Sequence, residues 1–142
     1  MKKSYFTSSG FTLMEVLITI VIIGVLAGLA VPMYQSTVEE ARSNEAKANL
    51  QVIYLAEKIF QLDNSEYYPK ASGTETDYTN INKFLKADLS QQYYTLKIVA
   101  SGGATSTGYV ATAATRVGNA TKYYTINQAN PPARLDQSGN SW

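Results

Sequence analysis

The sequence predicts an α+β fold, in which a long N-terminal helix packs on a small C-terminal antiparallel sheet of three to four strands. Three observations favour it. An uncharged, largely aliphatic run covers residues 16–38. A helical spacing of apolar residues then continues to about Leu62. From residue 93 onward apolar residues recur at every second position, as in half-buried strands. The 142 residues suffice for one domain with an appendage, not for two full cores.

The first half of the expected helix is long enough to cross a membrane. Residues 16–38 would span roughly 35 Å as an α-helix, and a hydrocarbon core is about 30 Å thick. Lys2 and Lys3 precede the run and would keep the N-terminus in the cytoplasm. A secretory signal peptide begins in the same way, and residues 28–30 (Gly-Leu-Ala) would serve as its cleavage site. Against that alternative, the run exceeds the usual apolar core of about 7–15 residues.

From Val38 onward the pattern is that of an amphipathic helix. One apolar row, interrupted by Glu57, consists of Ala46, Leu50, Ile53 and Phe60. A second row, which we expect to form the wider buried face, consists of Val52, Ile53, Ala56, Ile59 and Phe60. No glycine or proline occurs between Met33 and Tyr68. One helix is therefore predicted from about Phe11 to about Leu62, with a bend at Pro32.

The remaining sequence predicts turns and strands. Residues 63–92 are rich in turn formers, with a helical turn expected at residues 80–85. Tyr94, Leu96, Ile98 and Ala100 alternate with more polar residues and predict the first strand. Further strands are expected at residues 109–117, 123–128 and 134–136, separated by turns at Gly102-Gly103 and Gly118-Asn119 and by the pair Pro131-Pro132. Such a sheet needs a partner surface, and the amphipathic half of the helix is the one candidate.

The composition excludes several kinds of chemistry. The chain has no histidine and no cysteine, which rules out disulfides, Cys/His zinc sites, cysteine nucleophiles and a Ser-His-Asp triad. Its net charge of +1 gives no electrostatic reason to expect a nucleic acid partner. We therefore expect no catalytic residue, no metal and no cofactor, and we do not expect an enzyme.

The segment from Gly10 to Glu15, Gly-Phe-Thr-Leu-Met-Glu, resembles the prepilin motif of type IV pilins and of the related pseudopilins of type II secretion. In both families a short basic leader ends in Gly, the cut precedes a Phe, and a Glu follows four residues after that Phe. An apolar helix comes next, with a Gly midway and a Pro near its end, here Gly24 and Pro32. The resemblance covers about residues 1–35. It implies cleavage after Gly10, methylation of the new α-amine of Phe11, and polymerisation into a helical filament.

The resemblance further implies three parts. Residues 1–10 would be a leader removed by prepilin peptidase. Residues 11–38 would be a helix held first in the inner membrane and then in the filament core, and residues 39–142 would be a globular head. The expected partners are other copies of the chain, the peptidase and the inner-membrane assembly machinery, and the final location is a pilus outside the cell. The filament's task, whether adhesion, twitching motility, DNA uptake, secretion or conduction, stays open.

Three classes of protein fit the sequence. We favour a major pilin, because the run from Tyr124 to Gly139 resembles the last strands of major pilin heads and no acidic calcium-binding loop like that of major pseudopilins is evident. The cysteine pair that staples the C-terminal loop of many pilins is absent, as it is from many pseudopilins. A type II secretion pseudopilin is therefore the alternative. The third class is a membrane-anchored or secreted binding domain.

Glu15 is the most informative residue of the apolar segment. A carboxylate at the centre of a membrane helix costs about 2.5–3.5 kcal/mol. Near the helix start it can instead reach the interface, where the helix dipole favours it. The family resemblance implies a sharper role, in which Glu15 pairs with the α-amine of Phe11 on a neighbouring subunit and sets the axial register.

Gly24, Gly28 and Pro32 are expected to govern the packing and flexibility of the helix. The two glycines form a small-xxx-small pattern, which permits close helix approach, although such patterns are also simply tolerated in apolar helices. Pro32 removes a backbone donor. Residues 24–32 are therefore the softest part of the helix, and in the family this part can unwind on assembly.

Overall fold

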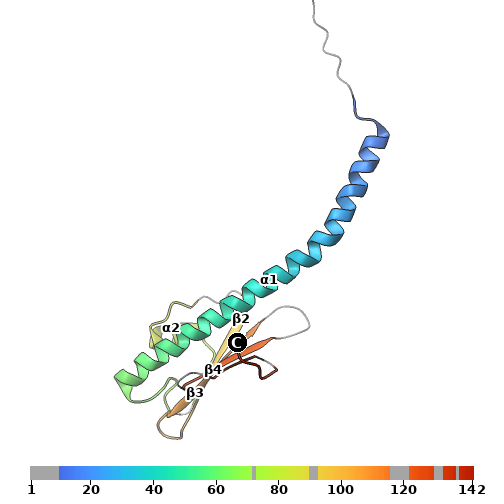
Figure 1. Ribbon diagram of the computed structural model, residues 1–142. Coiled ribbons are helices and arrows are strands. Elements are labelled where there is room, and N and C mark those ends of the chain that lie inside the picture. The colour runs from blue at the N-terminus through green and yellow to red at the C-terminus, as the bar shows by residue number, and fades with distance from the viewer. Residues whose placement is uncertain (1–9, 72, 90–92, 116–121, 130–132, 137) are drawn as a thin grey trace, which may run out of the picture. The chain divides into compact units, whose positions relative to one another are not determined.

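The computed structural model describes residues 10–71, 73–89, 93–115, 122–129, 133–136 and 138–142. A long helix, α1 (Leu13–Asn64), is followed by β1 (Thr74–Glu75), α2 (Tyr78–Leu85), β2 (Tyr94–Ser101), β3 (Gly108–Thr115), β4 (Tyr123–Asn127) and β5 (Arg134–Asp136). The chain divides into two compact units, one ending at Val38 and the other comprising Glu39–Trp142, which we call the head. The α+β fold, with a long N-terminal helix packed against a small antiparallel sheet, is confirmed (Figure 1).

The helix α1 has clear start and stop signals. The Oγ1 of Thr12 accepts a hydrogen bond from the backbone N–H of Glu15 at 3.2 Å, and the Thr12 carbonyl accepts the N–H of Val16 at 3.3 Å. Threonine followed three residues later by glutamate is a capping-box sequence. The helix continues through Pro32 without ending. It stops after Asn64, because Ser65 adopts a φ of 60°, which lies in the left-handed region.

The sheet is an antiparallel meander in the order β1-β2-β3-β4-β5. The three longer predicted strands and the short one at 134–136 are confirmed within one to two residues at the ends that are described. The sheet nevertheless has five strands, because Thr74 and Glu75 pair with Val99 and Ile98. A two-residue strand has no alternation from which it could have been predicted. The expected turns at Gly118-Asn119 and Pro131-Pro132 lie outside the described residues.

The turn after β2 requires glycine at position 102. Gly102 has a φ of +121°, and a Cβ built there would lie 2.3 Å from the Oγ1 of Thr107. Both the backbone conformation and the space therefore exclude a larger residue. Nearby, the N–H of Thr107 donates to the carbonyl of Ser101 at 2.9 Å. The predicted Gly102-Gly103 turn is thus confirmed, and it fixes the register of β2 with β3.

The core of the head lies between one face of the sheet and the second half of α1 (Figure 1). The residues at alternate positions of β2, β3 and β4 point into it, and cross-strand pairs such as Ile98–Ala111 and Ala113–Tyr124 bring them together. The sheet contributes Tyr94, Leu96, Ile98, Ala100, Tyr109, Ala111, Ala113, Tyr124 and Ile126. From α2 and the loops, Ile81, Leu85 and Leu89 close the core at one side.

The buried face of α1 differs from the one we expected. The buried residues of this helix are Ser43, Ala46, Leu50, Ile53, Ala56, Glu57 and Phe60. The interrupted row is therefore the core face, and the row with Val52 and Ile59 is wrong as a unit, since these two side chains are 42% and 58% exposed. Both sides of this half of the helix are apolar, so spacing alone could not decide which side meets the sheet.

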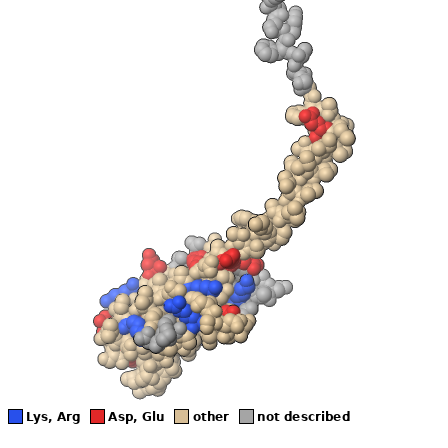
Figure 2. Space-filling view, viewed as in Figure 1, with Lys and Arg blue, Asp and Glu red and all other residues tan. Residues whose placement is uncertain are grey.

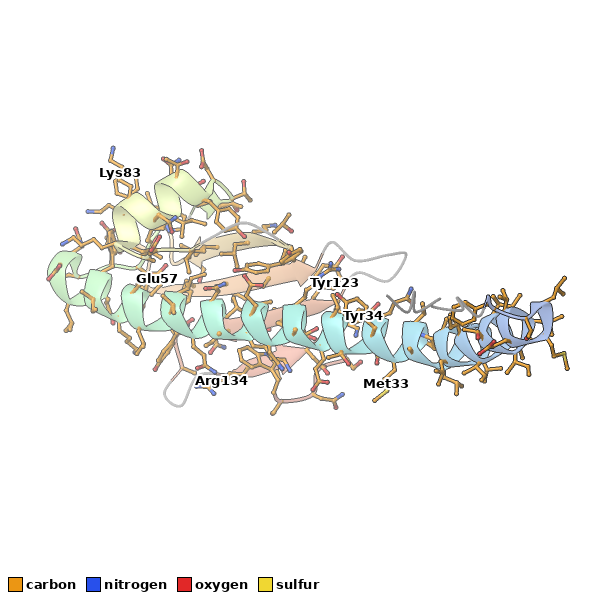
Figure 3. All side chains as sticks on the ribbon, turned by 90° about the horizontal axis from the view of Figure 1, so that it is seen from above. Met33, Tyr34, Glu57, Lys83, Tyr123 and Arg134 are labelled. Carbon is orange, nitrogen blue, oxygen red and sulfur yellow. The ribbon has the colours of Figure 1, made fainter. Side chains whose placement is uncertain are left out.

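Glu57, which interrupts the apolar row in the sequence, is fully buried on that core face (Figure 3). Its Oε2 accepts the backbone N–H of Tyr68 at 2.9 Å. Its Oε1 has no hydrogen-bond partner among the described residues, and the same is true of the buried hydroxyl of Tyr109. Burial raises the pKa of the Glu57 carboxyl to about 8, against the smaller opposing effect of the Tyr68 N–H. The carboxyl is therefore mostly protonated at neutral pH.

Candidate functional site

The first half of α1 is an apolar surface exposed along its whole length. Every described residue from Gly10 to Thr37 is exposed; Phe11 is 82% exposed and Met33 74%. The helix is long and apolar enough to cross a membrane, a property that signal sequences share. On the face seen in Figure 2 this segment is tan except for one acidic patch near its start, whereas charges of both signs gather on the head.

Glu15 lies in the first turn of this helix. Its backbone N–H is engaged by Thr12, and its carbonyl accepts the hydroxyl of Thr19 at 2.7 Å. Within the described part of the chain its carboxylate has neither a hydrogen-bond donor nor a salt-bridge partner. The next charged residue along the chain is Glu39. The structure therefore presents one carboxylate at the start of a 23-residue uncharged surface. No described residue of the chain compensates its charge.

The residues around the expected cleavage point are open. A Cβ at Gly10 would meet no atom within 4 Å, so nothing in the described chain obstructs the bond between Gly10 and Phe11. The first two turns carry a shallow apolar groove lined by Phe11, Thr12, Leu13, Val16, Leu17 and Ile20. This end of the chain is thus accessible both to a protease and to an apolar partner.

Gly24, Gly28 and Pro32 have no packing role within the described chain. A Cβ at either glycine would meet nothing within 4 Å, although glycine inside a helix is less stable than alanine by about 1 kcal/mol. Ser36 and Thr37 both donate side-chain hydrogen bonds to the carbonyl of Met33, at 2.9 and 3.0 Å. Nothing in the described chain therefore requires small residues at positions 24 and 28.

Two features of α1 were not predicted from the sequence. The capping role of Thr12 was visible in the spacing Thr12-x-x-Glu15, which is the capping-box pattern. The burial of Glu57 carried no such signal, because a glutamate is far more often found at the surface.

Comparison with known proteins supports the family resemblance. Residues 6–31 match the model of the prokaryotic N-terminal methylation motif. The chain is 39% identical to the type II secretion system core protein G of Pseudomonas aeruginosa over 67 residues, which is 47% of each chain. It is 39% identical over 67 residues to the Escherichia coli core protein G, covering 47% of this chain and 46% of that one. With the type IV major pilin protein PilA of Myxococcus xanthus it shares 40% identity over 58 residues, 41% of this chain and 26% of that one.

The aligned part spans about half the length of the core G relatives. No solved structure gives a significant match. The chain carries the methylation motif and is homologous over about half its length to pilins and pseudopilins, which are structural proteins and not enzymes. Matches to core protein G are more numerous than matches to a pilin.

Proposed function

We propose that this chain is the structural subunit of a type IV pilus, which polymerises after cleavage between Gly10 and Phe11 and methylation of the Phe11 α-amine. The observation that carries the proposal is the lone Glu15 at the start of an exposed, uncharged helix inside the methylation motif. An apolar surface of this length is unstable in water. It requires lipid before assembly and neighbouring helices afterwards.

The proposal gives Glu15 a specific task. In the membrane its carboxylate lies about one helical turn from the α-amine of its own Phe11. Within a filament the surroundings become apolar side chains of other copies, where an unpaired charge is strongly unfavourable. An incoming subunit that places its α-amine beside that carboxylate satisfies the charge, and this favours one axial offset over all others.

Gly24, Gly28 and Pro32 support the same assembly. The absence of neighbours around the two glycines in the described chain leaves room for close approach of another helix. Pro32 cannot donate its backbone hydrogen bond. In the proposed filament, residues 24–32 are the part of the helix that loosens when subunits pack or when the filament is stretched.

In the proposed sequence of events, the chain is first inserted in the inner membrane. Lys2 and Lys3 keep the leader in the cytoplasm, so that the head lies on the opposite side of the membrane. The prepilin peptidase then removes residues 1–10, and the assembly machinery of the inner membrane adds the subunit to a filament. The completed pilus extends from the cell surface.

A type II secretion pseudopilus is the second candidate, favoured by the number of relatives named core protein G. Both candidates share processing and polymerisation and differ in where the filament ends. Electron microscopy of cells with and without the gene separates them. Surface filaments that disappear with the gene support the pilus, whereas unchanged surface filaments together with a loss of exported proteins from the medium support the pseudopilus.

The processing step is tested by mass spectrometry of the subunit in sheared or purified filaments. We expect a chain that begins with methylated Phe11. A chain beginning at Val31 would show a signal peptide, and an intact Met1 would show an uncleaved anchor; either result contradicts the proposal. In the variant Gly10→Val, the bulkier side chain should block the cut, leaving unprocessed precursor in the membrane and few filaments.

A further inference from the structure

The head half of α1 has a second apolar face, opposite its buried one. Val52, Leu55, Ile59 and Leu62 are 42%, 62%, 58% and 83% exposed. At about 100° of rotation per residue, these side chains centre roughly 160° away from the residues that meet the sheet. With the exposed Ala48 they form what we call the outer stripe: Ala48, Val52, Leu55, Ile59 and Leu62.

The outer stripe is unusual for the surface of a small domain. A helix that covers a sheet ordinarily carries charged and polar residues on its solvent side. Here no charged residue belongs to the stripe from Ala48 to Leu62, although its flanks carry charges. A contiguous exposed apolar surface of this kind marks an interaction site. The described residues of the head leave it uncovered.

The spacing of the stripe residues is that of a helix that packs against another helix. Ala48, Leu55 and Leu62 are separated by seven residues, and so are Val52 and Ile59. The steps alternate between four and three, which is the a/d pattern of a helix pair. The a positions are then the β-branched Val52 and Ile59, and the d positions include Leu55 and Leu62. β-Branched residues at a with leucine at d favour two parallel strands.

We propose that, in the membrane before assembly, the outer stripe is a contact surface for the same stripe of a second copy of this chain, with the two helices parallel and in register. The inference rests on the proposed function in one respect. Copies that are inserted in one membrane by the same apolar segment have the same direction and the same depth, so an antiparallel partner is excluded. The stripe covers 15 residues, about two heptads, and a seam so short needs the high local concentration that the shared membrane supplies.

The charges at the edges of the stripe fit a parallel pair. Lys58 and Asp63 flank the stripe on opposite sides and correspond to positions g and e of the heptad. In a parallel, in-register pair, Lys58 of one helix lies beside Asp63 of the other, because these positions are five residues apart. Asp63 is exposed. Among the described residues, the Lys58 ammonium makes a long hydrogen bond to the carbonyl of Gln128, 3.5 Å, and a contact with the ring of Tyr54.

The absence of cysteine makes the contact directly testable. The full chain is produced in cells with a single substitution, Leu55→Cys or Leu62→Cys, and the membranes are oxidised. A disulfide requires Cα atoms about 4.4–6.8 Å apart, which facing d positions of an in-register pair approach. We expect both variants to give a covalent dimer on non-reducing gels. Lys97→Cys, exposed on the opposite face of β2 from the core, is the matched control and should give several-fold less dimer.

A second substitution tests whether the stripe itself brings the cysteines together. Adding Ile59→Glu to Leu55→Cys places two carboxylates face to face in the seam and should reduce the dimer to the level of the control. Equal cross-linking of Leu55→Cys and Lys97→Cys, or none at Leu55 and Leu62, would overturn the proposal. Leu55, Ile59 and Leu62 are exposed, so the head keeps its core in these variants.

The same cells separate this proposal from the proposed function. Filaments are sheared and counted without oxidation. Filaments without stripe cross-links would refute the outer-stripe contact alone, and stripe cross-links without any polymer would refute the filament alone.

Discussion

Each half of α1 carries a glutamate among apolar residues, but one of the two carboxyls is exposed and the other is buried. Glu15 belongs to a segment in which every described side chain up to Thr37 is exposed. Glu57 belongs to the head, has no exposed surface and accepts one backbone N–H. In the first half, no described residue of the chain covers the apolar side chains or pairs with the carboxylate. In the second half, the sheet covers the apolar side chains on one side of the helix, and the backbone N–H of Tyr68 donates to the buried carboxyl.

The two halves of α1 differ because only one of them has a sheet to pack against. The head half has a sheet to pack against, so its apolar residues on that side stabilise a fold. The first half has no such partner within the described chain, and in the proposed function its apolar residues contact lipid before assembly and other copies afterwards. The outer stripe of the head half belongs with the first half in this respect, because its residues also remain exposed.

The strongest test of the comparison removes the charge of Glu15. Glu15→Gln keeps the size and hydrogen bonding of the side chain, and Glu15→Leu makes it apolar. We expect both variants to insert and to be cleaved, yet to lose most of their polymer, because the neighbouring α-amine loses its counter-charge. The measurement compares processed subunit in membranes with subunit in sheared filaments. Glu40→Gln, on an exposed position of the same helix in the head, is the control and should assemble normally. Abundant filaments from both Glu15 variants would mean that this carboxylate merely reaches the interface.

A matched pair of leucines tests the two sides of the head half. Leu50 is fully buried and Leu55 is 62% exposed. Leu50→Ala should lower the free energy of unfolding of the head by about 2–5 kcal/mol, because it leaves a cavity. Leu55→Ala should change it by less than about 0.5 kcal/mol, while weakening the stripe contact. Chemical denaturation of the full chain in detergent measures both. Equal losses would show that the stripe is part of the core.

The buried Glu57 predicts an unusual dependence of stability on pH. Its pKa in the folded head is about 8 and its ordinary value is 4.5. The folded state therefore holds a proton that the unfolded state has released. The contribution of this group is fully present below about pH 4.5, falls as the pH rises, and is lost above about pH 8. Glu57→Gln, which has no proton to lose, should flatten this part of the profile. The thermal midpoint, measured in detergent between pH 5 and 9, checks both chains; parallel profiles would contradict the assignment.

The smallest expected effect concerns the softness of the first half. Replacing Gly24, Gly28 and Pro32 together by alanine removes two residues of low helix propensity and restores a missing donor. The resulting filaments should extend less under force in optical-trap or atomic-force measurements, or assemble less well if close helix packing needs the glycines. Val25→Ala leaves both glycines and the proline in place and serves as the control. Filaments of the triple variant with wild-type length and extensibility would remove the proposed role of these residues.

Several elements could be predicted from local sequence pattern. The long helix, α2, and the strands at 94–101 and 123–127 follow from spacing, because a period of 3.6 or 2 places apolar side chains on one face whatever the partner is. The motif from Gly10 to Glu15 likewise pointed to the correct relatives. Such features are local, and a single sequence contains the information that defines them.

The buried side of the head helix, in contrast, depends on long-range contacts. Ile53 and Val52 are adjacent and equally apolar, yet Ile53 is fully buried and Val52 is 42% exposed. The sheet can cover only one side of a helix, and the position of the sheet depends on the chain between residues 65 and 127. The pairing of Thr74 with Val99 and the burial of Glu57 depend on the same long-range contacts. Periodicity reports that a face is apolar; only the arrangement of distant segments determines which apolar face lies against the sheet.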